Sequence, residues 1–152
     1  MMRTFLSWVG LWLAAALTTA ALGSLVQSWH NMSAIAALGV PVTAGERLAA
    51  MGADLITFGP VWAILVALAL LPALPIAGLI TRRLASLSDP IRRQTFYGLA
   101  AFIAVLALLL IINTLAPMTP IAATRSASGL LGMALPALAG GWLFARYSGG
   151  KH

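Results

Sequence analysis

The side chains that could bind or activate a substrate are few in this sequence, and most of them fall between long apolar runs. Six are expected to lie together on one side of a membrane, as a candidate site for an anionic ligand or an acidic partner. They are His30, Glu46, Arg47, Asp54, Asn113 and Arg125.

Arg125 is the most informative of the six. A helix that begins near Pro120 would place Arg125 in its second turn, where the helix dipole disfavours a cation and so favours an anionic partner nearby. Glu46 and Asp54 are the internal candidates, which would make Arg125 a structural clamp. Two alternatives stay open: the side chain reaches to the membrane interface, or it binds a lipid phosphate or an acidic group of a partner.

His30 and Asn113 each have two interpretations. A histidine with an ordinary pKa near 6.5 can act as a pH switch, but a single interfacial histidine is more often an anchor. Asn113 could donate a hydrogen bond across helices, or it could mark the end of a membrane span.

A second polar stretch, residues 81–94, separates two long apolar runs and carries four arginines. Arginines in short loops favour the cytoplasmic side of a membrane, so this stretch is predicted to be a cytoplasmic loop. The same side chains could also contact anionic lipid head groups. They are Arg82, Arg83, Arg92 and Arg93.

The sequence does not contain the residues that several kinds of chemistry require. The chain has no cysteine, which excludes disulfides and thiolate metal sites. The predicted spans hold no ionisable residue in their interiors, whereas proton relays and ion-coupled transporters usually place such groups there. The two histidines fall on opposite sides of the membrane, and no metal-ligand spacing or phosphate-binding glycine loop is present. We therefore predict no metal and no cofactor, and regard catalysis as disfavoured.

Composition excludes a water-soluble domain. Of 152 residues, 61% are hydrophobic and 8% are charged, compared with about 25% charged residues in soluble domains. The formal charge of +6 comes mostly from residues in the predicted cytoplasmic segments, so it indicates membrane topology and no nucleic-acid partner.

The elements that must position these residues are four membrane-spanning helices in one all-α domain, because each crossing needs roughly 20 apolar residues. The spans are predicted at about 4–28, 60–80, 95–116 and 120–147, with both termini in the cytoplasm. Arginine in preference to lysine, with abundant alanine and leucine, favours a bacterial inner membrane.

An outer cap is predicted at about 30–59. Within it, Thr43 and Glu46 match a capping box, the pattern of a helix start in which two side chains satisfy free amides. The helix that follows, over residues 44–58, would be amphipathic and would lie on the extracytoplasmic surface.

Small residues recur every fourth position in the last span, at Ser128, Gly132, Pro136 and Gly140, a pattern that allows close helix packing in lipid. The preferred hypothesis is therefore a non-enzymatic accessory or assembly subunit, with membrane lipids, a second copy or a larger membrane protein as partners. The first alternative is a carrier or channel for a small apolar or lipid-like molecule. The second is a lipid-modifying enzyme that uses His30, Glu46 or Asp54 as a base beside Arg125.

Overall fold

The computed structural model describes residues 2–115 and 121–149, with the side chains of residues 2–4, 85 and 122 excepted. The described chain is all-α, and four stretches are long and apolar enough to cross a membrane: Phe5–Ala37, Gly59–Arg83, Pro90–Leu115 and Ala127–Ser148. The prediction of four spanning helices with one additional short helix is confirmed. The α-helices are α1 (Met2–Ala37), α2 (Ala44–Thr57), α3 (Gly59–Arg83), α4 (Pro90–Leu115), α5 (Ala127–Ala134) and α6 (Pro136–Ser148).

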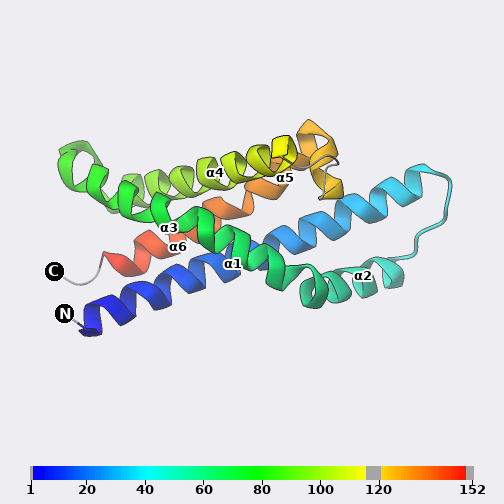
Figure 1. Ribbon diagram of the computed structural model, residues 1–152, viewed down its shortest axis with the longest axis horizontal. Helices are drawn as coiled ribbons and strands as arrows, with labels where there is room; N and C mark the ends of the chain where they lie inside the picture. Colours follow the sequence, from blue (N-terminus) through cyan, green and yellow to red (C-terminus); the bar gives the residue numbers. More distant parts are fainter. Residues whose placement is uncertain (1, 116–120, 150–152) are drawn as a thin grey trace.

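The four long helical segments form a ring in the order α1, α3, α4, α6, in which each packs on its two neighbours (Figure 1). The start of α1, the α3–α4 connection and the end of α6 lie at one end of the bundle, which we call the basic end. We call the opposite end, where α2 packs on α1 and α3, the cap end.

Two adjacent glycines set α6 between its neighbours. A Cβ on Gly140 would overlap Thr19 and the backbone of Ala15 in α1, and a Cβ on Gly141 would overlap the backbone of Tyr97 in α4. Because neither glycine has a side chain, α6 contacts the backbone of α1 at Gly140 and the backbone of α4 at Gly141. The predicted small-residue face is used here within the chain, so it does not by itself indicate a second copy.

The core is a set of stripes at helical spacing. One stripe on α3 is wholly buried at Trp62, Val66 and Leu70, and α4 contributes Val105 and Leu109. The outward faces are equally apolar. Exposed outward side chains include Ile64, Leu68, Leu79, Ile103 and Ile111. An apolar surface all round the bundle is what a lipid environment requires.

The first predicted span ends later in the structure, and the third begins earlier. Helix α1 continues past residue 28 to Ala37. Helix α4 begins at Pro90 rather than residue 95, because the Asp89 carboxylate accepts the backbone N–H groups of Ile91 and Arg92, at 2.7 and 3.1 Å. Asp89-Pro90 is thus a helix start, with aspartate as the cap and proline in the first turn, which are the preferred residues there.

The predicted fourth helix is broken into pieces. A 3-10 turn, η2 (Ala122–Arg125), precedes α5, and α5 ends just before Pro136, the first residue of α6. The predicted start of that helix near residue 120 lies outside the described residues. Helix α3, in contrast, continues through its two internal prolines.

Candidate functional site

Two polar side chains of α2 face the bundle. Arg47 and Asp54 are partly buried, as is Met51, whereas Glu46, Leu48, Ile56 and Thr57 are exposed. The amphipathic character predicted for this helix is present, but of its polar side chains Arg47 and Asp54 are the ones that contact α1.

Two of the candidate residues attach α2 to α1. The Ser28 hydroxyl of α1 donates to the Asp54 carboxylate at 2.6 Å. Arg47 donates to the Ser33 hydroxyl at 3.4 Å, and its guanidinium lies 4.9 Å from the ring centroid of Trp29. Because Ser28 is fully buried, its contact with Asp54 is the stronger attachment.

Replacing Ser28 by alanine is expected to weaken the attachment of α2. A hydrogen bond to a charged group contributes about 1.5–3 kcal/mol, and the variant leaves the partly buried Asp54 carboxylate without this donor. Unfolding in mild detergent should show a loss of this size. The matched control is Ser33→Ala, which removes only the long contact with Arg47. Equal losses of stability in both variants would show that the Ser28–Asp54 hydrogen bond contributes no more than the Ser33–Arg47 contact.

Glu46 caps the start of α2, as predicted. Its carboxylate accepts the Thr43 backbone N–H at 2.7 Å and the Thr43 hydroxyl at 2.8 Å, while Thr43 accepts the Glu46 N–H. The donation from Thr43, first from its backbone and then from its hydroxyl, lowers the pKa of Glu46 below its ordinary value. This carboxylate therefore stabilises a helix end.

Asn113 holds η2 against α4. Its side-chain oxygen accepts the Thr124 hydroxyl at 3.0 Å, and its amide donates to the Thr124 carbonyl at 3.5 Å. From the other side, Gln27 of α1 accepts the Ala123 backbone N–H at 3.3 Å. The turn is thus fixed between α1 and α4, which is the cross-helix role considered for Asn113.

Arg125 and His30 lie near this turn. Arg125 is the last residue of η2 and is exposed, just before Ser126, the N-cap of α5. It does not lie in the second turn of a continuous helix, so the dipole argument made from the sequence does not apply to it. His30 donates from Nδ1 to the Val26 carbonyl at 3.0 Å, since a carbonyl can only accept, and its ring lies against Gly132.

A hollow lies at the basic end, and none of these six residues lines it. It is a cavity of about 770 Å³ between α1, α3, α4, α6 and the 3-10 turn η1 (Ala85–Leu87). Its deeper part is apolar and aromatic, with Trp8, Leu74, Tyr97 and Phe144. Its part nearest the basic end is polar, with Thr81, Arg82, Ser88, Arg93 and Ser148. The cavity is therefore amphiphilic along its length.

Packing of aromatic rings keeps the deeper part of the cavity in shape. Trp8 stacks on Trp12 with ring centroids 6.3 Å apart and meets Phe144 edge-on at 6.1 Å. Tyr97 lies 5.7 Å from Phe144, and Gly78 leaves room for the Tyr97 hydroxyl. These arrangements are the favoured ones for aromatic pairs, so the cavity has preformed walls.

Two arginines give the cavity its charge. Arg82 is exposed in the last turn of α3. Arg93 is partly buried, with its guanidinium 5.7 Å from the Tyr97 ring centroid, and it donates to the Ala145 carbonyl at 3.2 Å and the Ser148 hydroxyl at 3.0 Å. No carboxylate is among the described lining residues, since Asp89 caps α4 instead. The charged side chains of the described lining are therefore all positive, and they lie in the polar part of the cavity.

Sequence reasoning identified the four arginines as contacts for anionic lipid, but it did not distinguish among them. Arg82 and Arg93 line the cavity, and their neighbours Arg83 and Arg92 do not. The aromatic residues of the cavity, Trp8 among them, were not predicted site residues. A pattern of arginines near aromatic residues at the same ends of several spans was the available signal.

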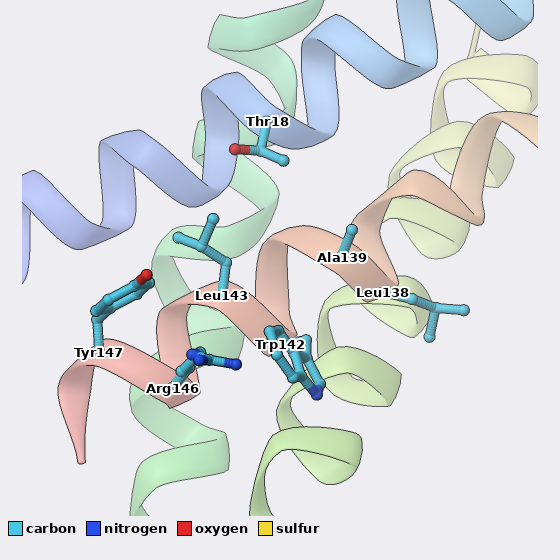
Figure 2. A pocket seen from close by; sticks show the side chains of 7 residues that line it. All are labelled: Thr18, Leu138, Ala139, Trp142, Leu143, Arg146 and Tyr147. Carbon is cyan, nitrogen blue, oxygen red and sulfur yellow. The ribbon is translucent and has the colours of Figure 1, made fainter. Parts of the chain in front are cut away.

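A second, more open hollow lies on the outside of the bundle (Figure 2). This groove, about 620 Å³, runs along α6 beside Thr18 of α1. Figure 2 shows Thr18 above Leu143 at the α1–α6 seam. The guanidinium of Arg146 lies 5.2 Å from the Trp142 ring centroid. The residues of α6 that line the groove are Leu138, Ala139, Trp142, Leu143, Arg146 and Tyr147.

Metal binding has no support from side-chain geometry, since no group of three or more histidine or acidic side chains that could hold an ion occurs in the described residues. No protein-family model, curated protein or solved structure matches the chain. Helix length and hydropathy define the class: a small multi-pass membrane protein with an all-α bundle.

Proposed function

We propose that this protein binds an acidic amphiphile in the cavity at its basic end, which makes the lipid-like molecule of the carrier hypothesis a specific one. The observation that carries this proposal is the division of one cavity into a part with two arginines and a part with aromatic and aliphatic walls. A molecule with a phosphate or carboxylate head group and a hydrocarbon chain has the same division.

The head group would supply the selectivity. The free energy of a lipid chain changes little when the chain moves from the bilayer into an apolar cavity, because both surroundings are equally apolar. A phosphate or carboxylate, however, gains charge-assisted hydrogen bonds from an arginine. Arg82 is the expected main contact, since Arg93 already donates to α6.

The distribution of the basic residues indicates how the protein is oriented in the membrane. We infer that the basic end lies on the cytoplasmic side of a bacterial inner membrane, since most of the basic residues gather at that end. The cap end, with α2 across it, would then face outward.

The two other hypotheses have less support. The enzyme hypothesis needs His30, Glu46 or Asp54 as a base. His30 donates to the Val26 carbonyl, and the two carboxylates accept hydrogen bonds from Thr43 and Ser28. The accessory-subunit hypothesis relied on the small-residue face of the last span, which packs on α1 through Gly140. Association with a partner protein stays a prediction.

The test compares adjacent arginines. Arg82→Gln should weaken the binding of 1-oleoyl lysophosphatidic acid about tenfold, which corresponds to about 1.4 kcal/mol. The matched control is Arg83→Gln, which removes the same charge from the same helix turn but does not line the cavity. Native mass spectrometry of protein in mild detergent, titrated with the lipid, gives both dissociation constants.

Two results would refute the proposal. One is that no acidic amphiphile binds to the unmodified protein. The other is that both variants weaken binding equally, because binding would then depend on the net charge of the basic end and not on the cavity.

A further inference from the structure

The cavity and the outer groove have one residue in common. Tyr147 of α6 lines both of them, and its side chain is 59% exposed. The groove contains only Thr18 from α1, whereas the cavity contains several residues near the start of that helix. Both hollows therefore adjoin the same α1–α6 seam, one inside the bundle and one facing the surrounding lipid.

The seam is closed at one level and open at another. At Gly140 the two helices touch, since the nearest backbone atom of Ala15 would lie 2.6 Å from a Cβ placed there. Toward the basic end, Gly10 of α1 lines the cavity, and a Cβ there would meet no atom within 4 Å. Tyr147 of α6 lines the same cavity, about one turn beyond Phe144 toward the basic end.

We propose that Tyr147 is the gate of a lateral opening between α1 and α6, through which the ligand passes from the bilayer into the cavity. This inference rests on the proposed function and makes the ligand a membrane lipid rather than a water-soluble anion. The groove receives the hydrocarbon chain among apolar side chains, and the chain then moves past Tyr147 toward the wall formed by Trp8 and Phe144.

Several features fit a lipid as the occupant. The groove belongs to a bundle whose outer faces are apolar and exposed, which is the surface that contacts lipid in a spanning protein. Arg146 and Trp142 lie together at the groove, and a basic and an aromatic side chain near the end of a span are typical contacts for lipid head groups. A head group held there would already be near the end of the cavity that contains Arg82.

The absence of cysteine allows one thiol to be placed at the gate. Tyr147→Cys removes a side chain that lines the cavity, so the dissociation constant and exchange rate of this variant for 1-oleoyl lysophosphatidic acid, measured before modification, are the reference. A bulky methanethiosulfonate reagent attached to Cys at this position should slow exchange of bound lipid against deuterated lipid by about tenfold, because a gate controls passage. Native mass spectrometry over time gives the rate, and dithiothreitol should restore it.

Two readouts separate a gate from a binding contact. A blocked gate slows association and dissociation together, so the dissociation constant changes much less than the exchange rate. The matched control is Ala139→Cys with the same reagent, because Ala139 is exposed in the groove but does not line the cavity. Its exchange rate should stay close to that of the unmodified protein.

The outcomes distinguish this inference from the proposed function. Unchanged exchange in the blocked protein, with normal binding, would overturn the gate and leave the arginine site in place. Binding of glycerol 3-phosphate as tight as that of the oleoyl lipid would overturn the bilayer as the source, since that probe has the head group without the chain. Failure of the oleoyl lipid to bind unmodified protein would overturn the proposed function and the gate together.

Discussion

Replacing Gly141 by leucine is expected to prevent the four-helix bundle from forming as it does in the native chain. A Cβ at this position would overlap the backbone of Tyr97 and lie 2.9 Å from the Ala101 Cβ, so α6 must move away from α4. Backbone atoms cannot rotate aside as a side chain can. We expect a loss above the roughly 1–3 kcal/mol usual for an overpacked core.

Size-exclusion chromatography in mild detergent and thermal unfolding give the measurement. Gly141→Leu should lose most of its monodisperse protein, and Gly141→Ala should be intermediate, because it adds only the first overlapping atom. The control is Ala139→Leu, which adds comparable bulk to an exposed position two residues earlier on the same helix. Native-like behaviour of Gly141→Leu would show that α6 does not pack on α4 as described.

The glycine pair also shows what could be learned from the sequence. Two adjacent glycines inside a helix cost roughly 1 kcal/mol each relative to alanine, so their presence indicates close packing. The pattern pointed to packing along one face. It could not show that Gly140 faces α1 while Gly141 faces α4, because that depends on the order of helices around the ring.

Local signals predicted local structure well. Thr43 and Glu46 form the expected capping box, and the apolar lengths gave the four spans. Asp89-Pro90 lies inside the predicted loop 81–94, although this pair is a strong signal for a helix start. The aspartate accepts two amides of α4, so the helix begins there and the connection from α3 is shorter than predicted.

The candidate site required contacts that sequence spacing does not encode. Charge alone suggested that Asp54 would pair with a cation, and Arg125 was the expected one. In the structure, the Asp54 carboxylate accepts a hydrogen bond from a buried serine hydroxyl, that of Ser28. Nothing in the sequence distinguishes this serine from the others in apolar spans as the hydrogen-bond donor to Asp54. The cavity could not be predicted from the sequence either, because it forms where the ends of separate helices meet.

The last prediction concerns Arg93, which has a structural role beside its place in the cavity. Its two hydrogen bonds reach Ala145 and Ser148 in the last turn of α6, where the helix dipole favours a cation. Arg93→Met should therefore lower the free energy of unfolding by about 2–3 kcal/mol even without lipid. Thermal or denaturant unfolding of delipidated protein measures the loss, and amide hydrogen exchange should speed up at the end of α6.

Arg92→Met is the matched control, because it removes one charge from the adjacent residue, which is exposed and does not line the cavity. Equal destabilisation by both variants would contradict the bonding role of Arg93, since only the loss of charge would then matter. Arg82→Gln completes the comparison: it should weaken lipid binding while leaving stability without lipid unchanged. Arg93→Met should reduce both, because this arginine joins α4 to α6 and lies in the wall of the same cavity.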